Sequence, residues 1–203
     1  MLFGTSISFK PDTSIFGENN LLNPDKLFKI LEYKAYLFGG VKINWECEAS
    51  LLKENTITPK TKIICFNNGI IEYMQFKSST IPMFTSSTFD GNVKIEDENV
   101  EWVIAWLTNS ESSFIETYCN TVPTPLGGSH ELGFRHALTK GIRNFADIKG
   151  FKKANELIYD DLISSTGYIL SIFINIFVNL IERCIYNFKI FYYFSIVFYF
   201  SIR

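Results

Sequence analysis

The chain has 203 residues, a formal net charge of −2 and a pI near 5.8. This balance excludes a strongly basic nucleic-acid-binding domain, and the length suffices for one substantial domain or for one domain and part of another. The four cysteines have neither the two-residue spacing nor the neighbouring histidines of a metal site. We therefore expect free thiols of a cytoplasmic protein rather than a metal centre or a disulfide framework.

The first predicted elements are a strand and a helix. Apolar and polar residues alternate over residues 4–12, which is typical of a strand. Asn23 and Pro24 favour the start of a helix, with asparagine as its cap and proline in its first turn. Apolar residues then recur at helical spacing as far as Phe38, and two glycines end the run.

The middle of the chain has shorter patterns. Strands are predicted over residues 41–45 and 62–66, with a loop over residues 49–60 between them. A short helix is expected over residues 68–74, and a linker or an edge strand over residues 82–89.

The strongest strand pattern covers residues 99–107, where apolar residues occupy alternate positions. Residues 114–119 are predicted to follow as its hairpin partner. Trp102 and Trp106 are expected to pack against helices rather than to stack on nucleic-acid bases.

A stiff loop comes next. Pro123 and Pro125 each restrict the preceding residue to extended geometry, so the loop has little freedom. Gly127 and Gly128 permit backbone angles that other residues avoid. Ser129 is the expected cap of the helix that follows.

That helix has one apolar stripe and a basic remainder. Its apolar residues recur at helical spacing: Phe134, Ala137, Leu138, Gly141, Ile142, Phe145 and Ala146. Arg135, Lys140 and Arg143 lie off the stripe and are expected to face away from it. From residue 135 to 153 there are six Lys or Arg and one acid, Asp147. These charges suit a solvated helix face, and equally a surface that attracts phosphates.

Three titratable positions invite a catalytic or metal-binding interpretation. His130 could act as a base, but no nucleophile with an orienting acid accompanies it, so we expect a structural hydrogen bond where the helix begins. Asp160 and Asp161 could bind a metal, but they precede the last predicted strand, which runs to residue 174, and are expected to cap a helix.

The order of residues from 120 to 135 resembles the transducer domain of bacterial type II topoisomerase B subunits. These are the ATPase subunits of DNA gyrase and topoisomerase IV. The similarity lies in Asn-Thr, then Gly-Gly-Ser-His-Glu, then Gly-Phe-Arg. Its structural motif residues are Gly127, Gly128, Ser129, His130, Gly133 and Phe134. Pro-Thr-Pro before the glycines is more similar to topoisomerase IV than to gyrase, and weaker similarity extends over residues 4–12 and 160–174.

The resemblance implies a fold class and a division of the chain. The fold is α+β, of the ribosomal-protein-S5-domain-2-like transducer type: a mixed sheet of about four strands with helices on one face. Residues 1–20 would be the end of the ATPase domain and residues 21–174 the transducer domain. Residues 175–203 would be an aberrant hydrophobic tail, since the family has no such segment.

The resemblance also implies a function: ATP-dependent passage of one DNA duplex through another, with an A subunit that cleaves DNA and a second B subunit. Transducer domains of the family line a cavity for the duplex. This implies DNA-phosphate contacts from the basic residues Arg135, Lys140, Arg143, Lys149, Lys152 and Lys153.

Cofactors belong to the intact family rather than to these 203 residues. In the family, ATP and Mg²⁺ bind the preceding domain, and a Gln-Thr-Lys loop of the transducer reaches the ATP. The one glutamine here, Gln75, is followed by Phe76, so that loop is missing. We therefore expect no catalytic, cofactor-binding or metal-binding residue in this chain, and no activity from it alone.

Two alternatives remain open. One is a mismatch-repair-type ATPase, a family that pairs the same two domains but lacks the Gly-Gly-x-His-x-x-Gly-Phe pattern. The other is a non-enzymatic, membrane-attached interaction module built on residues 190–202, which carry no charge and are rich in aromatics. A spanning helix needs about 20 apolar residues, so membrane attachment is less favoured than an out-of-frame reading of AT-rich DNA.

Overall fold

The computed structural model describes residues 7–17, 22–54 and 56–174, with Lys152 and Asn155 described by their backbone only. The chain forms two compact units. Unit 1 comprises Met1–Tyr33 and Ile43–Ile64, and unit 2 comprises Lys34–Lys42 and Cys65–Arg203.

Unit 1 combines helices with one hairpin. Its elements are α1 (Thr13–Phe16), most of α2 (Pro24–Leu37), β1 (Ile43–Glu46), the 3₁₀ turn η1 (Ala49–Leu51) and β2 (Thr61–Ile64). The strands β1 and β2 are antiparallel. The rings of Phe28 and Trp45 are both buried and meet edge to face, with centroids 5.5 Å apart. The predicted loop between the two strands is confirmed.

The predicted cap of α2 is confirmed, whereas the strand predicted before it is wrong for the residues described. The Asn23 Oδ1 accepts hydrogen bonds from the backbone N–H groups of Asp25, at 3.0 Å, and Lys26, at 3.2 Å. Residues 7–12 form no strand, and Asp12 instead caps α1 by accepting from the Ser14 N–H at 2.8 Å. An alternating pattern makes a strand only beside another strand, and no described strand pairs with these residues. Residues 4–6 lie outside the described residues.

Unit 2 is built on a five-stranded mixed sheet in the order β3-β4-β7-β5-β6. The strands are β3 (Phe89–Ile95), β4 (Glu98–Trp106), β5 (Phe114–Cys119), β6 (Val122–Pro123) and β7 (Thr166–Phe173). The pair β5 and β7 is parallel, and the other neighbours are antiparallel. A 3₁₀ turn, η2 (Ser110–Ser112), lies between β4 and β5.

The predicted pairing of residues 99–107 with residues 114–119 is wrong, because β7 lies between β4 and β5. The hairpin partner of β4 is β3, which the sequence pattern did not predict. Asp, Gly and Asn are depleted in strands, and all three occur in β3. Gly91 is needed there because a Cβ at this position would lie 2.2 Å from Cζ2 of the Trp102 ring.

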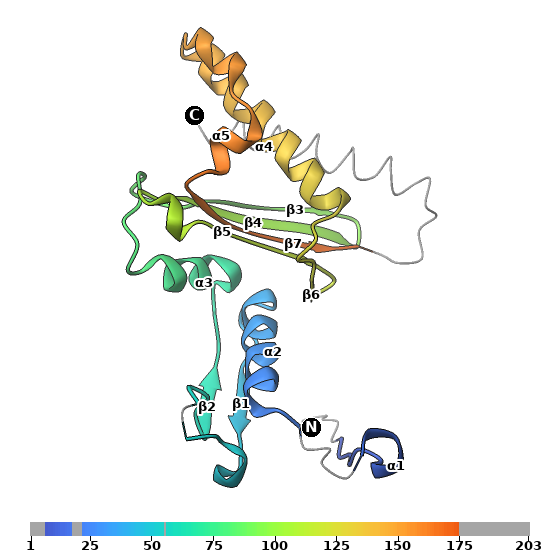
Figure 1. The fold of residues 1–203 in the computed structure, drawn as a ribbon. Coiled ribbons are helices and arrows are strands. Elements are labelled where there is room, and N and C mark those ends of the chain that lie inside the picture. The colour runs from blue at the N-terminus through green and yellow to red at the C-terminus, as the bar shows by residue number, and fades with distance from the viewer. Residues whose placement is uncertain (1–6, 18–21, 55, 175–203) are drawn as a thin grey trace. The chain divides into compact units, whose positions relative to one another are not determined.

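Helices cover both faces of this sheet, so the expectation of one covered face is wrong (Figure 1). The long helix α4 (Ser129–Ile148) lies on one face and α3 (Gly69–Ser78) on the other (Figure 1). Alternate residues of β4 and β7 therefore enter two different cores. The core under α4 contains Val100, Trp102, Ile104, Phe134, Ala137, Leu138, Tyr168, Leu170 and Ile172.

Two further elements complete unit 2, the 3₁₀ turn η3 (Lys152–Glu156) and the helix α5 (Tyr159–Ile163). The predicted capping is confirmed at Asp161, whose Oδ2 accepts from the Ile158 N–H at 2.9 Å. Among the described residues, no helix has the length and apolar character needed to cross a bilayer. The hydrophobic tail predicted at 175–203 lies outside the described residues.

Candidate functional site

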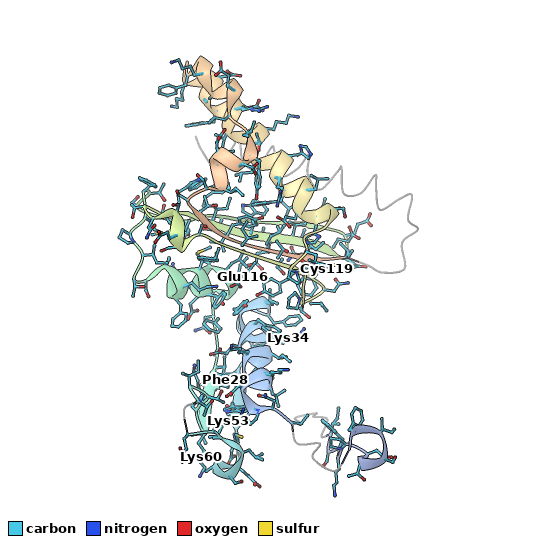
Figure 2. The ribbon with its side chains drawn as sticks, in the orientation of Figure 1. Phe28, Lys34, Lys53, Lys60, Glu116 and Cys119 are labelled. Atoms are coloured by element: carbon cyan, nitrogen blue, oxygen red, sulfur yellow. The ribbon has the colours of Figure 1, made fainter. Side chains whose placement is uncertain are left out.

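The site begins at the turn that follows β5. Asn120 and Thr121 have φ angles of 48° and 65°, in the left-handed region. The Asn120 side-chain amide donates to the carbonyl of Ile174 at 3.1 Å and accepts from its N–H at 2.9 Å. It thereby extends the pairing between β5 and β7 beyond both strands. Lys34, near the end of α2 (Figure 2), donates to the Thr121 carbonyl at 2.9 Å and holds the turn in place.

Three polar side chains then fix the loop between β6 and α4. The Thr117 and Thr124 hydroxyls lie 2.7 Å apart, and the Thr124 hydroxyl lies 3.1 Å from Nε2 of His130. His130 is buried, and this burial lowers the pKa of its imidazole, against a smaller opposing effect of Glu131. His130 thus makes a hydrogen bond at the start of the helix.

The glycine pair makes room for the two side chains that follow it. Gly127 has a φ of 72°, and a Cβ there would lie 2.4 Å from Oε2 of Glu131. A Cβ on Gly128 would lie 2.9 Å from the His130 ring. Gly128 rather than Ser129 is the N-cap of α4, and its cap position makes no side-chain hydrogen bond, so the prediction for Ser129 is wrong. The cap position is Gly128, one residue earlier, because a side chain at that position would collide with the His130 ring.

A buried polar cluster follows on the same helix; we call it the Glu131 cluster, comprising Glu131, Arg135, Tyr159 and Tyr168. The Glu131 Oε1 accepts from Nη2 of Arg135 at 2.6 Å and from the Tyr168 hydroxyl at 3.0 Å. The Tyr159 hydroxyl donates to that of Tyr168 at 3.0 Å, and the guanidinium of Arg135 lies 4.6 Å from the centroid of the Tyr159 ring. The cluster therefore joins α4, β7 and α5.

The charges of the Glu131 cluster support one another. The hydrogen bond to Glu131 raises the pKa of Arg135, which keeps the guanidinium charged. Burial raises the pKa of Tyr168 and that of Tyr159, so both hydroxyls remain neutral donors. Sequence reasoning assigned Arg135 to DNA and gave no role to the two tyrosines, because their meeting depends on the path of the chain through α5 and β7.

The remaining motif residues serve packing. Phe134 is fully buried, and its ring centroid lies 5.0 Å from that of Tyr168. Gly133 is half-buried on the first turns of α4.

The six basic residues predicted to contact DNA differ in their surroundings. Arg143 donates from Nε to the carbonyl of Leu157 at 2.9 Å, so it ties α4 to the segment before α5, as Arg135 ties it to the Glu131 cluster. Lys140, Lys149 and Lys153 are exposed. Lys152 lies at the first position of η3. The exposed lysines are the residues of this set whose charges face solvent.

A second buried cluster lies on the opposite face of the sheet; we call it the Glu116 cluster, comprising Tyr36, Tyr73, Lys77, Glu116 and Tyr118. Glu116, on β5 (Figure 2), pairs with Lys77 of α3 and accepts from the Tyr118 hydroxyl at 2.9 Å. The hydroxyls of Tyr36 and Tyr118 lie 2.7 Å apart, and the rings of Tyr36 and Tyr73 stack at 3.7 Å.

A groove of about 400 Å³, which no sequence pattern predicts, opens along β5. It is lined by residues 115–118 and 123–127, with Glu131 and Arg135 on its wall. No group of three or more His, Cys, Asp or Glu side chains suited to a metal ion occurs within the described ranges.

The family model described as DNA gyrase B matches residues 69–177, which is more than half of the chain. The chain belongs to the DNA gyrase B family. The B subunit of DNA topoisomerase 4 from Rickettsia bellii is 42% identical over 175 residues, which cover 85% of this chain and 26% of that protein. The protein of the same name from Caulobacter vibrioides is 38% identical over 176 residues, covering 84% and 25%. This member of the family thus spans about a quarter of the length of those relatives.

Solved structures show the same fold. The 43K ATPase domain of Thermus thermophilus gyrase B, crystallised with an aminocoumarin, aligns with a TM-score of 0.65 at 24% identity, over 82% of this chain and 43% of that one. The topoisomerase IV ATP-binding domain of Francisella tularensis, with a small-molecule inhibitor, aligns with a TM-score of 0.62 at 21% identity, over 80% and 41%. The prediction of a type II topoisomerase B-subunit fragment with a mixed α+β fold is confirmed.

Proposed function

We propose that this chain is the transducer segment of the ATPase subunit of a topoisomerase IV. The observation that carries the proposal is similarity at about 40% identity, over most of the chain, to B subunits of DNA topoisomerase 4. In the whole protein, the activity would be ATP-dependent passage of one DNA duplex through another in the cytoplasm. The partners would be DNA, an A subunit and a second B subunit.

We propose the division of the chain into domains that the resemblance to the family implies. Residues 1–20 belong to the end of the ATPase domain, residues 21–174 to the transducer domain and residues 175–203 to an additional hydrophobic tail. We propose that ATP and Mg²⁺ bind the whole protein in the domain that precedes the transducer, as the resemblance to the family implies.

A chimera tests the proposal directly. Residues 21–174 replace the matching segment of the Rickettsia bellii protein, and ATP-dependent relaxation of supercoiled DNA is measured with the A subunit of that organism. We expect relaxation well above that of a matched chimera with the Gly127→Val and Gly128→Val substitutions. A chimera that folds and retains its A-subunit partner, yet does not relax DNA, would contradict the proposal.

Within this function, we propose that the exposed lysines of α4 and the following turn contact DNA phosphates, while Arg135 and Arg143 chiefly hold α4 in place. The supporting observation is the exposure of Lys140, Lys149 and Lys153 beside the internal hydrogen bonds of the two arginines. Such contacts attract DNA without reading its sequence, because the phosphates are common to all sequences.

The salt dependence of DNA binding tests these contacts. A variant with Lys140→Gln, Lys149→Gln and Lys153→Gln should flatten the slope of log affinity against log salt by about 3, since each phosphate contact contributes about 0.9. The control carries Lys26→Gln, Lys29→Gln and Lys94→Gln, three exposed lysines on other elements. Equal slopes for the two variants would show that the lysines of α4 form only a solvated surface.

A further inference from the structure

The end of α4 holds one aromatic side chain on a fixed backbone. Gly150 has a φ of 80°, and its N–H donates to the Asp147 carbonyl at 3.0 Å. The N–H of Phe151 donates to the Ala146 carbonyl at 2.8 Å, and its own carbonyl accepts from the Ala154 N–H at 3.1 Å. Both backbone groups of Phe151 are therefore held, which fixes the direction in which its ring leaves the chain.

The ring of Phe151 faces solvent. In helix ends of this kind the residue after the glycine commonly packs back on the last turn. Phe151 is instead 67% exposed, and the last residue of the helix, Ile148, is 61% exposed. The C-terminal end of α4 also projects away from the sheet (Figure 1). An apolar tip on a projecting helix is available to a partner.

The residues that flank Phe151 in the chain are locally basic, and the exposed acids Glu156, Asp160 and Asp161 follow in η3 and α5. Between residues 147 and 153 there are three lysines and one acid, Asp147. Lys149 and Lys153 are exposed and flank Phe151 in the chain. Nζ of Lys149 lies 5.6 Å from the centroid of the Phe145 ring, so this lysine stem lies along the helix. A partner of this tip must therefore accept an aromatic ring and carry negative charge beside it.

We propose that Phe151 is a wedge that enters the minor groove of duplex DNA, separates two stacked base pairs and bends the duplex, while Lys149 and Lys153 contact the adjacent phosphates. This inference rests on the proposed function, which supplies DNA as the partner. Apolar side chains inserted between base steps kink DNA toward the major groove, and flanking cations bind the backbone that the bend brings closer. Duplex DNA carries phosphates beside apolar base faces, so it meets both requirements of the tip.

The bend is measured with the full chain and a duplex of about 25 base pairs that has a flexible TA step at its centre and a fluorophore at each end. At saturating protein, the wild type should raise energy transfer, as expected for a kink of roughly 20–90°. Phe151→Ala should bind with about tenfold lower affinity, as for loss of an aromatic–base contact, and should leave the duplex straight at saturation. Phe151→Trp should restore both quantities.

Two controls separate the wedge from the lysine contacts. Phe76→Ala removes a ring of similar exposure, 69%, from α3, and it should behave as the wild type. Lys149→Gln with Lys153→Gln should lower affinity and flatten the salt slope by about 2, yet the duplex should still bend at saturation.

The outcomes distinguish the two proposals. DNA binding with the expected salt slope, but with equal bending by the wild type and Phe151→Ala, overturns the wedge and leaves the lysine contacts standing. It would assign the exposed ring to a protein interface. Absence of DNA binding by the wild type overturns both.

Discussion

A paired carboxylate lies on each face of the sheet of unit 2, and the two carboxylates differ in how they are neutralised. In the Glu131 cluster the cation comes from the same helix, four residues along, and the Glu131 side chain is only 9% exposed. In the Glu116 cluster the cation is Lys77 of α3, and the Glu116 side chain is 22% exposed. The first cluster joins α4, β7 and α5, and the second joins α3 and β5 with Tyr36.

The difference in exposure between the two carboxylates determines how much stability is lost when the cation of each cluster is removed. A deeply buried carboxylate that loses its cation has no water to replace it, whereas a partly exposed one can be solvated. The Arg135 side chain is 39% exposed, so it tolerates the loss of Glu131 better than Glu131 tolerates the loss of Arg135. Substitutions in the Glu131 cluster should therefore lower the stability of the fold more than those in the Glu116 cluster, and replacement of the cation Arg135 should lower it most.

The largest effect is expected for Arg135→Met. It leaves the Glu131 carboxylate buried without a cation and should lower the free energy of unfolding by about 3–5 kcal/mol. The matched change Lys77→Met should cost about 1 kcal/mol, because each carboxylate keeps a tyrosine hydroxyl but only that of Glu116 also keeps contact with water. Urea denaturation of the full chain, monitored by tryptophan fluorescence, measures both.

A double variant checks the cause of that loss. Glu131→Gln added to Arg135→Met removes the buried charge and should recover about 2 kcal/mol of the loss. If Lys77→Met were as damaging as Arg135→Met, the exposure of the carboxylate would not be what separates the two clusters.

The next effect concerns the glycine beside Glu131. Gly127→Ala requires a side chain in the left-handed region, at roughly 1–2 kcal/mol, and also forces the Glu131 carboxylate to move. We expect a total loss of about 2–3 kcal/mol in thermal denaturation. Gly150→Ala is the control, because its φ is 80° but the space around it is open, so only the strain remains. Equal losses would mean that the position of Glu131 contributes nothing to stability.

The sequence predicted most of the local structure of this unit. The spacing of apolar residues, together with the glycines and prolines between segments, located α4, its apolar stripe and the strands β4 and β5. These patterns depend only on residues near one another in the sequence. The role of His130 also followed from local reasoning, since its partner Thr124 lies six residues away.

Long-range pairing could not be predicted in the same way. The position of β7 between β4 and β5 depends on which strand edges meet, and no pattern within a single segment records this. Lys77 pairs with Glu116 across 39 residues of sequence. The pair forms because α3 covers the second face of the sheet, and the sequence did not predict a helix on that face. Arg135 and Arg143 were assigned to DNA because a basic residue off the apolar stripe looks the same whether its partner is a phosphate or its own chain.

The third prediction compares one tyrosine from each cluster. Tyr168→Phe removes the hydroxyl that donates to Glu131 and accepts from Tyr159, and should cost about 1.5–2 kcal/mol, as for a hydrogen bond to a charged group. Tyr118→Phe should cost about 1 kcal/mol, because Glu116 keeps Lys77 and Tyr36 keeps a hydroxyl contact with Glu116 at 3.5 Å. A larger loss for Tyr118→Phe in urea denaturation would reverse the ranking of the clusters.

The smallest effect concerns pH and the loop that leads into the Glu131 cluster. Burial holds the pKa of His130 below its usual range, so on acidification the unfolded chain takes up a proton before the folded chain does. Stability from the neutral imidazole is therefore complete above about pH 6.5 and is lost as the pH falls below that value. His130→Gln keeps a hydrogen-bonding group near Thr124 but does not titrate, so the decline in Tm between about pH 7.5 and 5.5 should become shallower. His136→Gln is the control, because His136 is exposed on the same helix and should leave the decline unchanged. If instead His136→Gln flattened the decline and His130→Gln did not, the acid sensitivity would arise at the surface of α4 and not in the loop that positions Glu131.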